Sequence, residues 1–373
     1  MNKTMRYILI CVVSLFVAAG CDVHEFPRCD EEPVPFTLHI IFDTEMPLYK
    51  DIIYTRDGKS TKAPHEAHDI RYTIGAYRVG GSLEESRTAD TTFVFTRPES
   101  RELNYTVQFE LTEGLYDIRV WCDYVDAGSS ADKYYDTRNF AEITLLNRNR
   151  HEGSNDYRDA FRGTVRGEVV NTKFYRGDIA ASFKNEATVE MRRPMGKYRF
   201  ISTDVELFLD LLAMELKEAG KPESSIGIDE PSIEELKERI DIGELKVIFH
   251  YNHFMPCSYN IFTDKPADSW TGVSYTSPMY RLDKSEMLLG YDYIFVNGTE
   301  TTLNISLDIY TKENELISRS HPVNVPIRRS MLTDVRGEFL TSKASGGVAI
   351  NPGFDGDDYN VPILFRNARH HLQ

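Results

Sequence analysis

The sequence has 373 residues, of which 41% are hydrophobic and 12% are aromatic, so it can build sizeable cores and is not disordered. Its 43 Lys and Arg residues are outnumbered by 58 Asp and Glu residues, which gives a formal net charge of −15. This excess of acid argues against nucleic-acid binding, which needs a basic face for phosphates, and against polybasic attachment to an anionic membrane.

The N-terminus has the pattern of an exported protein. Lys3 and Arg6 precede the apolar run Tyr7–Ala19, which fits a secretory signal peptide and is shorter than the roughly 20 residues of a spanning helix. Small residues ending in Gly20 stand directly before Cys21 and resemble the lipobox of bacterial lipoproteins. This resemblance implies cleavage between Gly20 and Cys21 and acylation of the Cys21 thiol. The alternative is an ordinary signal peptide, cut nearby, with an incidental Cys.

We therefore predict a signal peptide at residues 1–20 and, at residues 21–35, an acidic, Pro-containing tether whose acylated Cys21 inserts into outer-membrane lipid. Acidic residues soon after this Cys resemble the surface-export signals of Bacteroidetes lipoproteins, which implies a surface-exposed protein. Three cysteines remain, too far apart for a disulfide framework, and we expect Cys122 and Cys257 to be buried thiols.

The first half of the chain alternates apolar and polar residues in short runs, as half-buried strands do. Two such runs, residues 104–111 and 118–124, flank a turn at Glu113 and Gly114 and predict an antiparallel hairpin. The residues predicted for its core are Tyr105, Val107, Phe109, Val120 and Cys122. Other strands are expected at 35–42, 69–79, 91–97, 142–146, 164–170 and 188–193. Together they predict a β-sandwich over residues 36–195.

The alternation breaks after residue 203. Asp204 is expected to cap a helix that stops at Gly220. The residues predicted for its core-facing stripe are Leu207, Leu211, Leu212 and Leu216. Ser232 and Glu235 fit the capping box of a second helix. Residues 204–241 are therefore predicted to be a small helical insert.

Strands resume after this insert. A hairpin is predicted between residues 288–296 and 301–310, because the Asn297-Gly298 pair between them is typical of a hairpin turn. Leu303, Ile305 and Leu307 are predicted to lie in its core. Other strands are expected at 245–251, 316–319, 323–328 and 335–341. Residues 196–373 are thus predicted to form a second β-sandwich, in which 345–359 is a loop. Val361–Phe365 is either its last strand or a strand donated to another subunit.

The sequence contains no HExxH, GxSxG, P-loop or GxGxxG motif. Asp156 and Asp159, in the stretch NDYRD, are expected to form ion pairs with Arg158 and Arg162 rather than to act as an acid and a base. We therefore predict no enzyme activity, no cofactor and no metal site.

Six stretches of the chain carry a resemblance to a known family. They are CDVHEFP from Cys21, YDIRVWCDYVDAGSSADKYYDT from Tyr116, NDYRDAFRG from Asn155, RRPMGKYRFISTDVE from Arg192, VRGEFLT from Val335 and NPGFDGDDYNV from Asn351. They resemble the FimB-like minor fimbrial lipoproteins of the fimbrillin superfamily, and a related family of uncharacterised Bacteroidetes lipoproteins. The resemblance implies two tandem transthyretin-like antiparallel β-sandwiches, a position at the base of a fimbrium, and binding to fimbrial or pilin-like subunits by β-strand donation.

The predicted function is therefore that of an outer-membrane lipoprotein, acting as a fimbrial anchor or minor fimbrial subunit in surface adhesion. The alternative is a glycan-binding surface lipoprotein, which would use exposed aromatic rings as platforms. Trp270 and Tyr275 are the candidate platform for a sugar. Trp121 lies on the polar side of its strand, where it is either exposed or packed on an edge.

Overall fold

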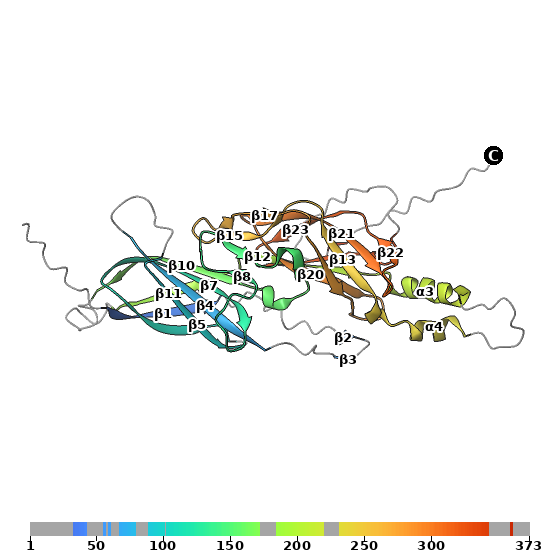
Figure 1. Cartoon of the computed structure of the whole chain (residues 1–373), viewed down its shortest axis with the longest axis horizontal. Coiled ribbons are helices and arrows are strands. Elements are labelled where there is room, and N and C mark those ends of the chain that lie inside the picture. Colours follow the sequence, from blue (N-terminus) through green and yellow to red (C-terminus); the bar gives the residue numbers. More distant parts are fainter. Residues whose placement is uncertain are drawn as a thin grey trace, which may run out of the picture.

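The computed structural model describes residues 33–42, 55–56, 59–60, 67–79, 89–100, 102–171, 184–219, 231–342 and 359–360. Most of these residues lie in β-strands, which form two lobes arranged end to end in an elongated molecule (Figure 1). The predicted all-β class with a small helical insert is confirmed. No helix of the described residues is long and apolar enough to cross a membrane.

The first lobe contains two sheets. One has the strand order β11-β1-β6, with bounds Glu186–Met191, Val34–Phe42 and Tyr105–Leu111. The other has the order β10-β7-β4-β5, with bounds Phe161–Val170, Gly114–Asp126, His68–Arg78 and Thr91–Pro98. Both β4 and β10 pair antiparallel with β7, which makes β7 a central strand.

The second lobe also contains two sheets. The first has the order β19-β20-β12-β24-β25, with bounds Tyr280–Arg281, Met287–Phe295, Met195–Ser202, Leu332–Gly337 and Tyr359–Asn360. The second has the order β18-β13-β21-β22, and β23 also pairs with β21. Its bounds are Ser274–Pro278, Lys246–Tyr251, Glu300–Tyr310, Leu316–Arg319 and, for β23, Val323–Arg328. The residue limits of the two predicted domains stay a prediction.

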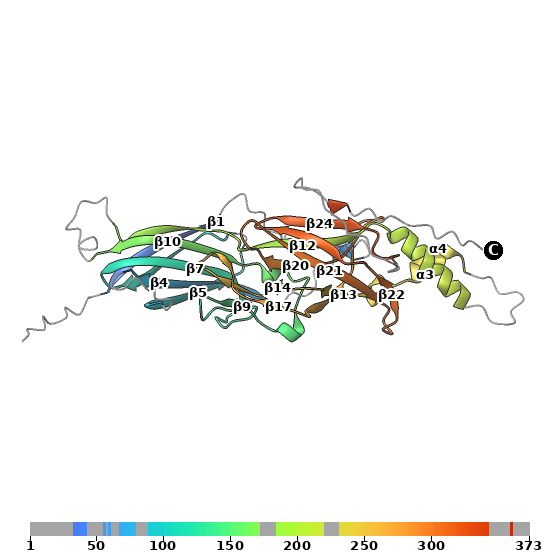
Figure 2. The same ribbon diagram turned by 90° about the horizontal axis from the view of Figure 1, so that it is seen from above.

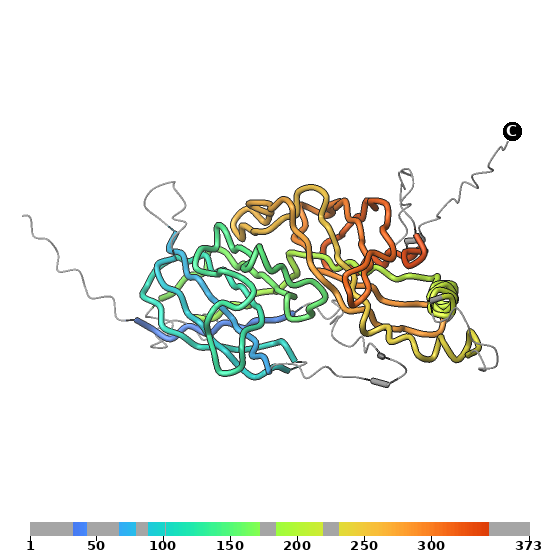
Figure 3. Tube along the Cα trace, turned by 45° about the vertical axis from the view of Figure 1, so that its right-hand side comes forward, coloured from blue at the N-terminus to red at the C-terminus, as the bar shows by residue number. Residues whose placement is uncertain are grey.

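Small sheets complete the fold. One has the order β16-β15-β9-β8 and another pairs β14 with β17. Their bounds are Lys265–Pro266, Ser258–Asn260, Ile143–Leu145, Tyr135–Asp136, Met255–Pro256 and Ser269–Trp270. A two-stranded sheet of β2 (Thr55–Arg56) and β3 (Lys59–Ser60) is separate from these. In the tube view, segments of the first lobe that are drawn in green lie next to the second lobe, at the place where the two lobes meet (Figure 3).

The helical insert lies at the outer end of the second lobe (Figures 1 and 2). Helix α3 spans Val205–Ala219 and helix α4 spans Ile233–Arg239. The predicted capping box of α4 is confirmed, since the Ser232 hydroxyl accepts from the Glu235 amide and the Glu235 carboxylate accepts from the Ser232 amide. Asp204 precedes α3 as expected, but its carboxylate accepts hydrogen bonds from Ser202 and Thr341.

The predicted stripe of α3 is wrong for three of its four residues. Leu207, Leu211 and Leu216 are exposed, whereas Leu212 packs partly buried against the core. The buried residues of the helix are Val205, Phe208, Leu209 and Ala213. Leucines occur on more than one side of this helix, so their number alone does not identify the side that faces the lobe. Contact with the lobe selects the side that includes the small residue Ala213, because a small side chain allows close approach.

The buried apolar side chains of both lobes form one continuous cluster. Every residue predicted for the two cores is buried, except that Tyr105 is partly buried against the cluster. The predicted buried thiols are also confirmed, since Cys122 and Cys257 are free and buried. Burial raises the pKa of Cys257 to about 12, so this thiol is unreactive at neutral pH.

Neither predicted hairpin exists. Strand β6 pairs with β1, whereas the next strand, β7, pairs with β4 and β10 in the other sheet. In the same way, β20 pairs with β12 and β19, whereas β21 pairs with strands of the opposite sheet. The turns at Gly114 and at Asn297-Gly298 therefore carry the chain from one sheet of a lobe to the other. Alternation shows that each strand has a buried face, but it does not show which strand is its neighbour.

Candidate functional site

The two lobes are joined by strands that come from both halves of the chain. Strand β9 of the first half pairs antiparallel with β15 of the second half, with Thr144 opposite Ser258 and Ile143 opposite Tyr259. The Leu145 amide also donates to the carbonyl of Cys257 at 2.8 Å. We call this region, with the buried polar residues described below, the junction.

The segment between β9 and β10 brings charged side chains into the junction. It contains two short 3-10 turns, at Arg148–Arg150 and Asp156–Arg158. The second turn begins at Asn155, whose side chain accepts a hydrogen bond from the Tyr157 amide. Ser154 has a positive φ of 54°, and its amide donates to the Tyr291 carbonyl of β20 at 2.7 Å. These local bonds fix the segment against the second lobe.

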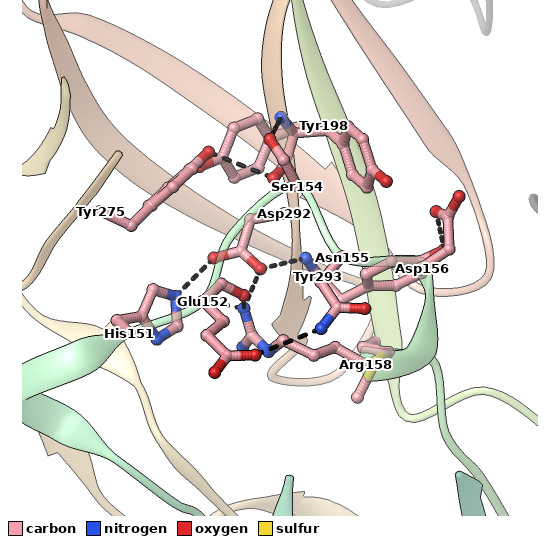
Figure 4. Close-up of polar contacts among 12 residues, drawn as sticks. His151, Glu152, Ser154, Asn155, Asp156, Arg158, Tyr198, Tyr275, Asp292 and Tyr293 are labelled. Atoms are coloured by element: carbon pink, nitrogen blue, oxygen red, sulfur yellow. Dashed lines mark hydrogen bonds and ion pairs between the residues drawn. The ribbon is translucent and has the colours of Figure 1, made fainter. Parts of the chain in front are cut away.

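Asp292 of β20 is the centre of the junction (Figure 4). Its Oδ2 atom lies 2.6 Å from His151 Nε2 and accepts from Tyr251 Oη at 2.5 Å. Its Oδ1 atom accepts from Arg158 Nη1 and, at 2.7 Å, from the Tyr293 amide. The side chains of Asp292, His151 and Arg158 are each at most 3% exposed. Charged groups from two halves of the chain thus satisfy one another away from water.

The pKa values of this cluster follow from burial and from its charges. Burial acts to raise the pKa of Asp292, but Arg158, His151 and the hydrogen bonds outweigh it and hold that pKa below its usual value. Burial, followed by the positive charge of Arg158, lowers the pKa of His151 below its usual value. The favoured state at neutral pH is therefore an ionised Asp292 beside a neutral His151.

Three tyrosine hydroxyls extend the cluster into the core of the second lobe. Tyr198 Oη lies 2.8 Å from Tyr251 Oη and 3.1 Å from Tyr275 Oη, and Tyr275 donates to the Tyr291 carbonyl. The ring of Tyr275 stacks on Phe249, with the centroids 4.7 Å apart. Each hydroxyl therefore has a hydrogen-bond partner inside the protein, as buried polar groups require.

Further ion pairs surround this centre. Lys197 of β12 is wholly buried, donates to Asp156 Oδ1 at 2.6 Å, and lies 4.0 Å from the centroid of the Tyr291 ring. Arg193, which is also wholly buried, makes a bidentate pair with Asp159 at 2.8 to 3.0 Å. Such charge-assisted bonds are stronger than neutral ones.

One carboxylate is shared by arginines of both lobes. Asp264 lies 2.5 Å from Arg162 of β10 and 2.8 Å from Arg329, which follows β23. The pKa of Asp264, which burial acts to raise, is held below its usual value by the hydroxyl of Tyr259 and by these two arginines. The first and second lobes are thus linked by a second charged contact outside the Asp292 cluster.

The chemistry of the junction is that of a structural connection. His151 and Asp292 resemble the base and orienting carboxylate of a hydrolase, but within the described residues no Ser or Cys is hydrogen-bonded to His151. The hydroxyl of Ser154 instead lies 2.6 Å from that of Ser277. Among the described residues, no group of three His, Cys, Asp or Glu side chains is arranged to hold a metal.

The sequence-predicted site residues are not brought together. Gly20 and Cys21 lie outside the described residues. Trp270 is half-buried at the end of β17, where it stays a candidate sugar platform. The Tyr275 half of the predicted platform is wrong, because Tyr275 is buried and its ring is stacked in the core. Trp121 is neither exposed nor at an edge, since Tyr135, Tyr259 and Phe295 cover it.

Ion pairs were expected for NDYRD, but the partners are different. Asp156 pairs with Lys197 and Asp159 with Arg193, while Arg158 and Arg162 reach Asp292 and Asp264. Sequence reasoning missed Asp292 and His151 altogether. The available signal was an acidic residue inside the apolar strand MLLGYDYIF, since a charge in a buried strand requires a partner.

Comparisons with known proteins identify the family. The model of a family of unknown function, DUF6562, matches residues 34–370. The chain belongs to this family. DUF6562 carries no assigned activity in that description, and no curated protein matches the chain in sequence.

Several solved structures are similar to this DUF6562 chain at low identity. The fimbrial anchor protein Mfa2 from Porphyromonas gingivalis is 11% identical, with a TM-score of 0.35 over 77% of this chain and 82% of that one. A putative cell adhesion protein from Bacteroides ovatus is 8% identical, with a TM-score of 0.39 over 84% and 95%. A fimbrial assembly protein from Parabacteroides distasonis is 9% identical, with a TM-score of 0.38 over 82% and 90%.

Proposed function

We propose that this protein is an outer-membrane lipoprotein that acts as a fimbrial anchor or minor fimbrial subunit in surface adhesion. The observation that carries the proposal is the junction. An anchor must transmit force between its membrane attachment and the structure it holds, so its lobes must not separate under load. Here the lobes share the β9–β15 pairing, a buried ion pair at Asp292, and partly exposed ion pairs at Asp156 and Asp264.

The arrangement of the elements suits such a role. Strand β1 begins at the outer end of the first lobe, and the helices α3 and α4 lie at the opposite end of the molecule (Figures 1 and 2). Strand β1 starts at Val34, so the last two residues of the predicted tether 21–35 already belong to the first lobe. With acyl chains on Cys21, the first lobe would stand next to the membrane and the second lobe would point away from it.

Partners are proposed to join by strand donation, in which main-chain hydrogen bonds between strands give affinity and alternate side chains give specificity. The candidate donor is Val361–Phe365, which lies outside the described residues. It follows β25, which pairs in parallel with β24 at Val335 and Arg336. The other interpretation, that this segment is the last strand of its own lobe, stays open.

The glycan-binding alternative keeps one aromatic candidate. Trp121 and Tyr275 are buried, and Trp270 is half-buried in β17. Half-burial of Trp270, the remaining predicted platform residue, supports this alternative less than the junction supports a load-bearing subunit.

The anchor proposal is tested with Cys21→Ala in the full chain, and Cys29→Ala serves as the matched control. We expect Cys21→Ala to leave the outer-membrane fraction and to release fimbriae into the medium, while Cys29→Ala behaves as the wild type. Outer-membrane retention of Cys21→Ala at the wild-type level would refute the lipid anchor. In the same assay, a chain truncated after Asn360, which keeps β25, should stay anchored yet shed fimbriae if the segment is a donor. Normal retention by a stable truncated chain would exclude this segment as the donor.

A further inference from the structure

Helix α3 exposes a row of large apolar side chains. Leu207 is 51% exposed, Leu211 is 44% exposed and Met214 is 51% exposed. Their spacing of four and then three residues places them on one side of the helix, above one another. A row of this kind covers about two helical turns, roughly 10 Å. Clustered exposed apolar side chains of this kind, unlike scattered ones, form a candidate surface for a partner.

The row is held in a fixed position. The opposite side of α3 is buried through Val205, Phe208, Leu209 and Ala213. On the side next to α4, Asp210 forms an ion pair with Lys237. The helix is therefore anchored on two sides, which leaves the row of Leu207, Leu211 and Met214 directed outward.

Acidic residues border the row. Glu215 follows Met214 and is exposed, and Glu218 is exposed one turn beyond Met214 on the same side of the helix. Glu206, at the other end of the row, already pairs with Arg281 and Lys237, so the acids that a partner would meet are Glu215 and Glu218. Two copies of this face would bring like charges together, which disfavours self-association. A border of acid instead complements Lys or Arg residues on a partner.

We propose that this face of α3 binds an amphipathic helix of a partner protein, whose apolar stripe is bordered by Lys or Arg. A helix fits because a straight row with this spacing matches the packing of side-chain ridges between two helices. The inference deepens the proposed function: in a chain tethered at Cys21, α3 lies at the end of the molecule away from the tether (Figure 1).

The test uses the folded full chain and two synthetic helical peptides, each with Leu residues along one stripe. One peptide carries Lys at the border positions and the other carries Glu there. Fluorescence anisotropy should show binding of the Lys peptide and not of the Glu peptide. Leu211→Gln and Met214→Gln should each weaken binding of the Lys peptide about tenfold.

Leu216→Gln is the matched control, because Leu216 is 48% exposed on the same helix but lies outside the row. Gln has a helix propensity similar to that of Leu and Met, so these variants should keep their helix content in circular dichroism. The double variant Glu215→Lys, Glu218→Lys should exchange the preference and bind the Glu peptide.

Three results would overturn the inference. They are failure of the Lys peptide to bind, self-association of the chain that depends on Leu211, and binding to phosphatidylcholine vesicles that depends on Leu211. Peptide binding requires no membrane attachment, so a failure of the Cys21→Ala test would refute the anchor function without affecting this measurement. Conversely, loss of peptide binding would leave the anchor test valid.

Discussion

At the scale of single residues, the junction shows how a charge is accommodated inside a β-rich core. Asp292 is buried, and its two oxygens accept from His151, Tyr251, Arg158 and the Tyr293 amide. Desolvation would otherwise destabilise this carboxylate strongly. Most of these donors come from other strands or from the other half of the chain. The Asp292 carboxylate can therefore be buried at low cost only when the two lobes are correctly assembled.

Removing the charge of Asp292 should destabilise the protein. Asp292→Asn keeps the shape of the side chain but leaves Arg158 buried without a counter-charge, which typically costs about 3–5 kcal/mol. The measurement is the free energy of unfolding in denaturant. Glu190→Gln is the control, because it breaks the exposed Arg192–Glu190 pair and should have little effect. A loss under about 1 kcal/mol for Asp292→Asn would show that the cluster does not stabilise the junction.

Stability should fall as the pH is lowered through the range in which histidine titrates. His151 faces Asp292, Arg158 and Glu152, and its pKa in the folded protein lies below the usual value, chiefly because of burial. In the unfolded chain the imidazole takes up a proton near pH 6.5, whereas the folded protein resists protonation. Protonation therefore favours unfolding below about pH 6.5.

The measurement is the free energy of unfolding at pH 7.5 and at pH 5.5. His151→Gln should have a smaller loss over this interval, because Gln keeps a donor toward Asp292 and has no proton to gain. An equal loss in the wild type and in His151→Gln would show that another group is responsible.

At the scale of elements, the important features are the short connections between sheets. The chain leaves β6 or β20 and enters the opposite sheet of the same lobe. A turn of hairpin length can therefore serve a sandwich crossing, provided that the backbone bends sharply. Gly298 meets this requirement with a φ of +69°.

We expect Gly298→Ala to destabilise the protein by about 1–2 kcal/mol, the cost of a left-handed backbone for a residue with a Cβ atom. No atom lies within 4 Å of the position that this Cβ would take, so steric contact adds nothing. Gly298→Asn is the control and should cost less, since Asn tolerates the left-handed region. Denaturant unfolding compares the two variants, and a larger loss for Asn than for Ala would contradict the explanation.

At the scale of the whole molecule, the buried contacts make the two lobes one mechanical unit. The apolar cluster is continuous, strands of both halves share a sheet, and ion pairs cross between the lobes. Lobes that are joined only by a linker unfold independently, whereas lobes that share buried charge lose stability together when the interface opens.

Differential scanning calorimetry of residues 22–373 should therefore show one transition, in which the calorimetric and van't Hoff enthalpies agree. The triple variant Asp292→Asn, Asp156→Asn, Asp264→Asn should separate it into two transitions, because all three charged connections are then lost. Two transitions in the wild type would contradict the view that the junction couples the lobes.

The local features of this fold were determined by the sequence itself. Most of the predicted strands lie within one or two residues of observed strands, although β12 and β18 were not predicted, and Ser232 with Glu235 specified the start of α4. Burial of Cys122 and Cys257 also followed from their number and spacing. These properties depend on residues that are close together in the chain, so a single sequence is sufficient to predict them.

The partners of these elements were decided only by the tertiary structure. Whether β7 pairs with β6 or β4, which side of α3 is buried, and which cation Asp156 meets all depend on segments far away in the sequence. The same holds for Trp121, which is covered by Tyr259 from the other half of the chain, and for Tyr275, whose ring stacks on Phe249 of the neighbouring strand β13. Alternation predicts that one face of a strand is buried. Which side chains cover that face depends on how the sheets and lobes pack together.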